Sequence, residues 1–183
     1  MKIAPLKIAG SFAIDLEARG DARGYFMRTY DEAIFAAHGL PTRWVQMNES
    51  LSANPGTIRG LHFQRPPHTE TKLVRCTAGA LLDVFVDLRE GSPTYGQWDA
   101  VELSAARHNA VMVPRGCAHG FCSLLPDSIV NYMVDNAYTP GAEKGVRWND
   151  PALGIKWPLN GEPTISRKDA AWPLFQDVDP VRL

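Results

Sequence analysis

The chain has 183 residues, of which 45% are hydrophobic, 21% charged and 9% aromatic. This composition predicts one globular domain over residues 1–183 and argues against a two-domain enzyme. Lysine and arginine number 19 against 20 aspartates and glutamates, so the net charge of -1 argues against a nucleic-acid binder. No apolar run approaches the roughly 20 residues that span a bilayer, and residues 1–10 lack the features of a signal peptide. We therefore expect a cytoplasmic protein with no nucleic-acid or membrane partner.

Glycines and prolines, 15 and 14 in number, divide the chain into short apolar segments. A helix is predicted first, over residues 31–38, with Asp31 as its cap and Gly39 as its end. Strands are then predicted over Thr57–Phe63, Lys72–Thr77, Leu81–Leu88, Gln97–Leu103, Ala110–Pro114 and Ser128–Asp135. A last helix is predicted to start near Ser166, with Asp169 in a capping-box position. This pattern predicts an all-β jelly roll with a few short peripheral helices.

The predicted strand over Leu81–Leu88 is nearly continuous in apolar residues, which indicates a strand covered on both faces. Asp83 and Asp87 interrupt that apolar run. The proline-rich tail after Trp157 is expected to wrap around the domain in an extended form.

The three cysteines, Cys76, Cys117 and Cys122, are odd in number and lack the paired spacing of a zinc site. We expect buried thiols rather than a disulfide framework. Cys117 and Cys122 flank His119, so a cysteine–histidine nucleophilic pair is the less favoured alternative.

Two of the five histidines lie in constrained settings. Strict alternation along the strand around His62 would place Arg59 on one face and His62 with Gln64 on the other, unless a bulge intervenes. The segment Pro114–Gly120 forms a tight turn that delivers His119 into the next strand. This Pro-x-Gly-x-x-His turn is familiar from cupin jelly rolls, where the histidine points into the barrel.

Cations accompany these histidines, since Lys72 and Arg75 follow closely and Arg59 precedes His62. Inert, hydrogen-bonded core histidines are the simpler interpretation. A small barrel rarely gathers cations unless something anionic occupies it, however, so an anionic ligand is expected.

A metal site is the main competing use of the histidines. It would have to combine His62, His68, Glu70 and His119, but the His-x-His pattern of metal-binding cupins is absent. Two consecutive prolines separate His62 from His68, and Lys72 disfavours a divalent cation. We therefore expect no metal, while a metal-dependent cupin oxygenase or isomerase stays an alternative.

A series of motifs runs in order through most of the chain. They are Asp21–Phe26, Gln46–Asn48, Arg59–Gln64, Lys72–Arg75, Asp83–Arg89, Ser92–Gly96, Ala118–Phe121, Tyr132, Tyr138, Glu143, Trp148–Pro151, Ile155–Pro158 and Ser166–Asp169. Together they resemble the dTDP-4-dehydrorhamnose 3,5-epimerase family, nucleotide-sugar epimerases of the cupin superfamily. The resemblance implies a metal-free cupin jelly roll (a double-stranded β-helix), usually a homodimer. It would invert carbons next to the ketone of dTDP-4-dehydro-6-deoxy-D-glucose, in the dTDP-L-rhamnose pathway, without a cofactor.

The resemblance also implies catalytic roles. His62 occupies the position of the base, and unperturbed histidine, with a pKa of roughly 6.5, suits proton removal next to a carbonyl. Asp169 would orient His62, and Tyr132 would be the acid on the opposite face of the sugar. Lys72, helped by His119, would stabilise the enolate oxygen. Taken alone, Tyr132 could be a cross-strand contact and Lys72 a solvated edge residue.

Further positions match residues that bind the nucleotide-diphosphate sugar in the family. They are Arg23, Arg28, Gln46, Asn48, Arg59, His119, Tyr138, Glu143 and Lys168. Arg28 stands where the family commonly has a glutamate, Met47 replaces an aspartate, and the spacing from Gln46 to Arg59 is one residue longer.

These departures leave the nucleobase open, and with it the choice between a dTDP-linked, a CDP-linked and a further modified sugar. The sequence also leaves open whether C3, C5 or both carbons are inverted. A non-catalytic cupin module that only binds sugars is the alternative from another functional class.

Overall fold

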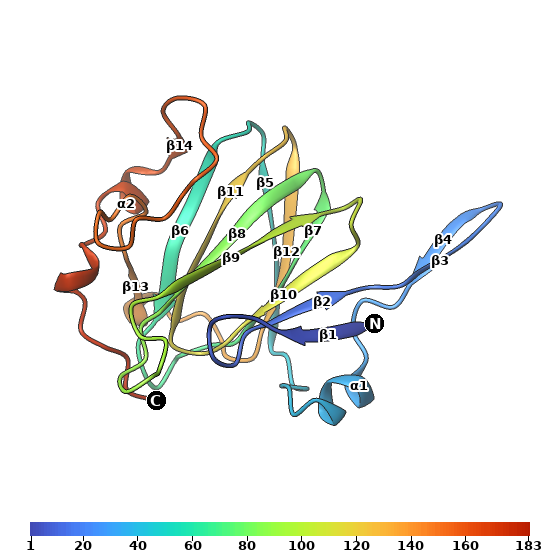
Figure 1. Ribbon diagram of the computed structural model, residues 1–183, viewed down its shortest axis with the longest axis horizontal. Coiled ribbons are helices and arrows are strands. Elements are labelled where there is room, and N and C mark those ends of the chain that lie inside the picture. Colours follow the sequence, from blue (N-terminus) through green and yellow to red (C-terminus); the bar gives the residue numbers. More distant parts are fainter.

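Antiparallel β-strands dominate the molecule, seen in a computed structural model that describes residues 1–183 (Figure 1). One six-stranded sheet consists, in spatial order, of β1 (Lys2–Pro5), β2 (Phe12–Asp15), β10 (Asn109–Val113), β7 (Lys72–Ala78), β12 (Ser128–Val134) and β5 (Gln46–Ser52). The other consists of β13 (Glu143–Gly145), β6 (Thr57–Gln64), β11 (Cys117–Ser123), β8 (Ala80–Asp87) and β9 (Trp98–Ser104), with β14 (Thr164–Ile165) beside β6. Outside these sheets lie β3 (Ala18–Asp21), β4 (Gly24–Met27), α1 (Glu32–Ala37), α2 (Arg167–Ala170), η1 (Pro140–Ala142) and η2 (Phe175–Asp177).

Successive strands from β5 to β8, and again from β9 to β12, change sheet at every step. This winding confirms the predicted all-β jelly roll. Each of the six predicted strands is present, with ends that differ by at most one residue. The sequence does not predict β1 to β5, because these strands are short or only half-buried and carry mixed side chains.

The main core fills the space between the two sheets. Val74, Val111 and Val130 from the first sheet meet Leu81 and Phe85 from the second, and all five are fully buried. Each such side chain stabilises the fold by roughly 1.5–3 kcal/mol through its removal from water. The two-sheet sandwich is therefore held together mainly by apolar packing.

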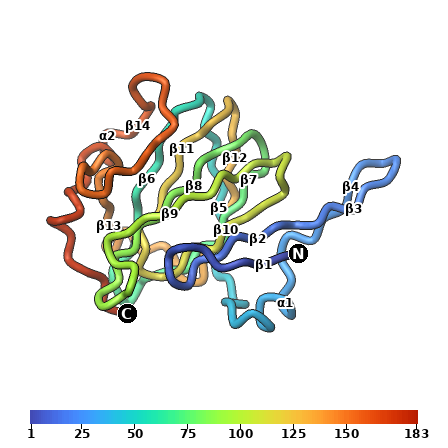
Figure 2. The backbone as a smooth tube through the Cα atoms, in the orientation of Figure 1, coloured from blue at the N-terminus to red at the C-terminus, as the bar shows by residue number.

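The opposite face of the second sheet carries another core, which the C-terminal part of the chain covers (Figure 2). Val84 and Val86 of β8 pack there against Val146, Val178 and Val181. Because Leu81 and Phe85 of the same strand face the other core, β8 is covered on both faces, as its apolar sequence predicts.

Both predicted helices are present and capped as expected. The backbone N–H of Ile34 donates to Asp31 at 3.2 Å, and Gly39 follows α1 with a φ of 67°. The N–H of Asp169 donates to Ser166 Oγ at 3.0 Å at the start of α2. The carboxylate of Asp169, in contrast, turns to β6 instead of closing a capping box.

A bulge in β6 overturns the predicted alternation along this strand. His62 pairs with His119 of β11, but Arg59 pairs with Phe121, so Gly60 and Leu61 together oppose a single residue. Arg59 therefore comes to the same side of the strand as His62, and both side chains line one cavity. Gly60 has a φ of 123°, and a Cβ there would lie 2.6 Å from the Cα of Gly120, so only glycine fits.

Asp87, the last residue of β8, has a fully buried carboxylate. It accepts hydrogen bonds from Arg89 Nη2 at 2.7 Å, Ser92 Oγ at 2.5 Å and Thr94 Oγ1 at 2.6 Å. Burial alone would raise the pKa of this carboxyl, but the donors outweigh burial and lower it to about 2. The charged form thus stabilises the fold above about pH 4, and this contribution is lost as the pH falls toward the folded-state pKa.

We expect Asp87→Asn to lower the free energy of unfolding by about 2 kcal/mol at neutral pH, because the charge is favoured by roughly two pKa units. Urea denaturation at a series of pH values measures this difference. It should shrink between about pH 4 and pH 2, where wild type also loses the charge. A difference that stays constant over this range would contradict the stabilising role of the charge.

Candidate active site

A cleft with two lobes, of about 490 and about 340 Å³, lies between the sheets. His62, Lys72 and Tyr132 line both lobes, so the lobes meet at these three side chains. The two volumes lie in the range of cavities that enclose small-molecule ligands. The other predicted site residues at the cleft are Arg59, His119 and Asp169 in the first lobe and Gln46, Asn48, Tyr138 and Glu143 in the second.

Several of these side chains lie on neighbouring strands, at positions that pair with one another. Tyr132 of β12 pairs with Asn48 of β5, and both side chains reach the second lobe. His119 of β11 pairs with His62 of β6 from the facing sheet. Lys72 is the first residue of β7, which lies beside β12 in the first sheet, so strands of both sheets contribute side chains to one cavity.

Asp169 anchors the imidazole of His62. Its Oδ1 lies 2.7 Å from His62 Nε2, and its Oδ2 accepts the backbone N–H of Gly60 at 3.2 Å. Burial alone would raise the pKa of Asp169, but the contacts with His62 and Gly60 outweigh it, so this pKa is lowered. Asp169 is therefore a carboxylate at neutral pH, and it fixes the orientation and proton of the imidazole.

Trp172, which the sequence analysis does not single out, supports this pair. Its indole N–H donates to Asp169 Oδ1 at 3.3 Å, and its ring meets that of His62 edge-on at a centroid distance of 6.2 Å. The indole occupies the space above Gly145, where a Cβ would come within 2.4 Å of the ring. Trp172 follows α2 directly, so its place depends on how the C-terminal segment folds back on β6.

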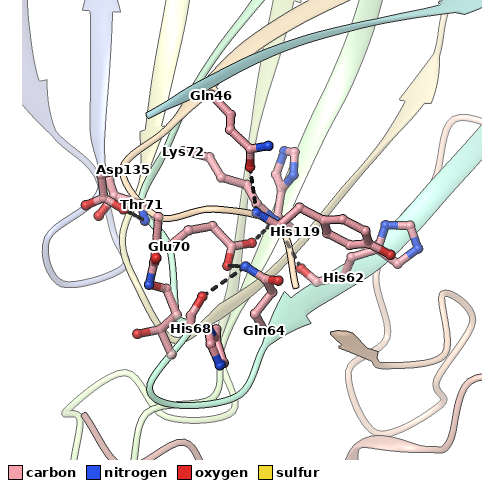
Figure 3. A network of polar contacts seen from close by, with 12 residues as sticks. Gln46, His62, Gln64, His68, Glu70, Thr71, Lys72, His119 and Asp135 are labelled. Carbon is pink, nitrogen blue, oxygen red and sulfur yellow. Dashed lines mark hydrogen bonds and ion pairs between the residues drawn. The ribbon is translucent and has the colours of Figure 1, made fainter. Parts of the chain in front are cut away.

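Tyr132 and Lys72 share the centre of the cleft. Burial raises the pKa of the Tyr132 phenol, and the nearby charge of Glu70 raises it further, so the phenol keeps its proton at neutral pH. The ammonium of Lys72 lies 3.2 Å from Glu70 Oε1 and donates to the carbonyl oxygen of His62 at 3.3 Å (Figure 3). This arrangement offers a proton donor and a cation next to an imidazole.

A second imidazole–carboxylate pair lies beside the first. Nε2 of His119 is 2.8 Å from Oδ2 of Asp83, which is fully buried and has no partner for its other oxygen. The interruption of an apolar strand by Asp83 was the only signal for this pair in the sequence. A buried carboxylate needs a polar partner, and the fold supplies His119.

The second lobe carries a polar cluster built on Glu143. Lys168 Nζ and the Tyr138 hydroxyl donate to Glu143 Oε2 at 2.5 and 2.7 Å. Burial would raise the pKa of Glu143, but these two donors outweigh it, so this pKa is lowered. The side chain of Gln46 joins the cluster by accepting the backbone N–H of Tyr138 at 2.5 Å.

Arg23 and Arg28 are the predicted binding residues that lie away from the cleft. Arg23 lies on the β3–β4 hairpin, which projects away from the two sheets (Figure 1), and it pairs with Asp21. Arg28 follows the hairpin and contacts Asp31 at 2.9 Å. The hairpin forms a separate two-stranded sheet, whereas the strands that line the cleft, from β5 onward, belong to the two large sheets.

The three cysteines are buried free thiols, as predicted. Burial raises the pKa of Cys117 to about 12, which keeps this thiol from acting as a nucleophile beside His119. Histidine, cysteine and acidic side chains nowhere form a group of three or more that could hold a metal ion. None of the helices has the length and apolar character needed to cross a membrane.

Comparisons with known proteins place this geometry in context. A family model described as dTDP-4-dehydrorhamnose 3,5-epimerase matches residues 5–177. A curated protein with that name from Sinorhizobium fredii is 48% identical over 154 residues, which cover 84% of this chain and 79% of the relative.

Solved structures of proteins named as epimerases are also similar to this chain. That of dTDP-6-deoxy-D-glucose-3,5-epimerase from Legionella pneumophila, in complex with dTDP-4-keto-L-rhamnose, has a TM-score of 0.94 at 36% identity and covers 100% of this chain and 98% of its own. That of ChmJ, a 3'-monoepimerase from Streptomyces bikiniensis, in complex with dTDP-quinovose, has a TM-score of 0.88 at 35% identity and covers 94% and 87% of the two chains.

We expect Gly145→Ala to lower the free energy of unfolding by about 1–3 kcal/mol, because the new methyl group would overlap the Trp172 ring. Gly141→Ala is the matched control, since a Cβ there has open space around it. Urea denaturation followed by tryptophan fluorescence compares the two variants. Equal stabilities would contradict the close packing of Trp172 on β13.

Proposed function

The chain belongs to the dTDP-4-dehydrorhamnose 3,5-epimerase family, and from this membership we propose that it is an isomerase that inverts C3 and C5 of dTDP-4-dehydro-6-deoxy-D-glucose. The observation that carries the proposal is the cleft in which His62, held by Asp169, shares one cavity with Tyr132 and Lys72. The product would be dTDP-4-keto-L-rhamnose, the ligand named for the Legionella pneumophila structure.

The reaction begins with proton removal next to the C4 ketone. The ring nitrogen of His62 that is not bound to Asp169 takes the proton, and the electron pair of the broken C–H bond moves to the ketone oxygen. The resulting imidazolium is stabilised by the Asp169 carboxylate. Lys72, with His119 beside it, stabilises the enolate oxygen.

Inversion is completed from the opposite face of the sugar. The phenol of Tyr132 donates a proton to the carbon as the electron pair returns from the enolate oxygen. Solvent then restores the proton of Tyr132 and removes the proton of His62, so each inversion introduces one solvent hydrogen. The raised pKa of Tyr132 supports this assignment, because the phenol must be protonated before each turnover.

The nucleotide diphosphate would be bound by the polar groups around the catalytic centre. A guanidinium such as that of Arg59 suits phosphate oxygens, and the exposed ring of Tyr138 can stack on a base. Gln46, Asn48 and the Glu143–Lys168 pair supply further polar contacts.

A mono-epimerase is the second candidate, because the 3'-monoepimerase ChmJ is similar in structure over most of the chain. One base and one acid serve either outcome. Both carbons can be served by the same base and acid after the sugar ring shifts in the cleft.

We further propose a homodimer, which would give a role to the two arginines that lie outside their own cleft. On the β3–β4 hairpin, Tyr25 is 61% exposed and Phe26 67% exposed. Neighbouring exposed aromatic side chains of this kind indicate a surface that another protein surface covers. A second copy of the chain could receive this hairpin, so that Arg23 and Arg28 bind the partner's substrate. Residues 1–183 would act as one domain in the cytoplasm, where free thiols such as Cys76 persist.

His62→Ala should abolish turnover, with a loss of at least about a thousandfold in kcat, because the base is removed. The measurement is deuterium incorporation from heavy water into dTDP-4-dehydro-6-deoxy-D-glucose, with NMR locating the label at C3, C5 or both. CDP-linked and dTDP-linked substrates are compared in the same assay. Undiminished exchange in the variant would reject the assignment of the base, and ligand binding without exchange in wild type would indicate a sugar-binding module.

A subunit-mixing experiment tests the dimer. Arg23→Ala and His62→Ala should each be nearly inactive alone, whereas a refolded equimolar mixture should recover roughly a quarter of wild-type activity. The recovered activity comes from mixed dimers, in which one cleft has both an intact His62 and an intact Arg23 from the partner. A mixture as inactive as its components would contradict this arrangement.

A further inference from the structure

Glu70 lies in the cleft and forms an ion pair with Lys72. The proposed reaction assigns no role to Glu70. The side chains of Glu70 and Lys72 are only 8% and 10% exposed, and their charged atoms lie 3.2 Å apart. Glu70 lines the second lobe together with Lys72 and Tyr132. The pair is therefore part of the cavity wall rather than of the outer surface.

Both oxygens of the Glu70 carboxylate are engaged (Figure 3). Oε1 faces Lys72, and Oε2 accepts the side-chain amide of Gln64 at 2.8 Å. The same amide donates to the carbonyl oxygen of His68 at 2.9 Å, while Gln64 Oε1 accepts the backbone N–H of Thr139 at 2.6 Å. Glu70 is thus held from one side by a rigid network and presents its charge to Lys72 on the other.

Lys72 has few other polar partners in this place. Its remaining acceptor is the carbonyl oxygen of His62 at 3.3 Å, which carries no full charge. Removal of an ammonium from water disfavours its charged form unless an anion compensates. Glu70 is the acidic side chain in direct contact with Lys72.

We propose that Glu70 is a positioning residue, whose carboxylate holds the Lys72 ammonium in place and directs it toward the ketone oxygen of the substrate. This inference rests on the proposed epimerase function, in which Lys72 stabilises the enolate. Glu70 acts through Lys72 and needs no contact with the sugar.

Other titratable or charged groups face Lys72 from the elements around it and share its electrostatic environment. They are Arg59 and His62 of β6, Cys117 and His119 of β11, Tyr132 of β12, Tyr138, Glu143 of β13 and Asp169 of α2, whose carboxylate is paired with His62. Burial favours the neutral forms of Cys117 and Tyr132, whose pKa values it raises. The side chain of Glu143 is occupied by Lys168, which leaves Glu70 as the counter-ion of Lys72.

The test is Glu70→Gln, which preserves shape and removes the charge. We expect kcat to fall by about ten- to a hundredfold with KM changed less than about threefold, because the loss concerns charge that develops in the transition state. The contact between the two side chains is read directly from the ¹⁵Nζ NMR signal of Lys72, assigned with Lys72→Arg.

In Glu70→Gln the Lys72 signal should move away from its wild-type chemical shift, because the ion pair is lost. Glu70→Asp, which keeps the charge, should restore part of kcat. Glu102→Gln is the matched control, because it removes an exposed carboxylate on β9 that pairs with Arg107. This control should leave kcat and the Lys72 signal unchanged.

An unchanged Lys72 signal in Glu70→Gln would overturn the proposal, and so would an unchanged kcat. A variant that unfolds by circular dichroism is replaced by Glu70→Asp, in which the Lys72 signal must stay near that of wild type. Failure of the epimerase function is recognised separately, because wild type itself would then show no label exchange while the NMR signals could still be compared.

Discussion

Strands β6 and β11 approach each other so closely at Gly60 and Gly120 that neither position has room for a side chain. The bulge at this crossing turns Arg59 into the cleft and leaves the N–H of Gly60 free to bind Asp169. Asp169 in turn holds His62. The geometry of the candidate base therefore depends on a backbone contact between two strands rather than on the histidine itself.

Paired charges are the second organising feature of the cleft. The carboxylates of Asp169, Asp83 and Glu70 are all shielded from water, and each lies beside an imidazole or an ammonium. Taking a charge out of water costs several kcal/mol unless a partner compensates. Pairing lets the cavity keep its acids, bases and cations in fixed orientations, so that the binding of an anionic sugar nucleotide does not have to assemble them.

The same scaffold serves enzymes named for different outcomes, a 3,5-epimerase and a 3'-monoepimerase among them. Their likeness to this chain extends over nearly its whole length, so the fold alone does not select the carbon that is inverted. Specificity must therefore come from the side chains at the cleft.

Periodicity and turn residues were sufficient to predict the central strands, both helices and the jelly roll, because these depend on local burial and backbone preference. Ordered motifs identified the family and the candidate trio of His62, Tyr132 and Asp169. Only the tertiary structure decided that a bulge puts Arg59 beside His62, and that Glu70 faces Lys72. These contacts join side chains through register, bulges and chain reversal, which no local pattern encodes, since one inserted residue reverses the face on which every later side chain lies.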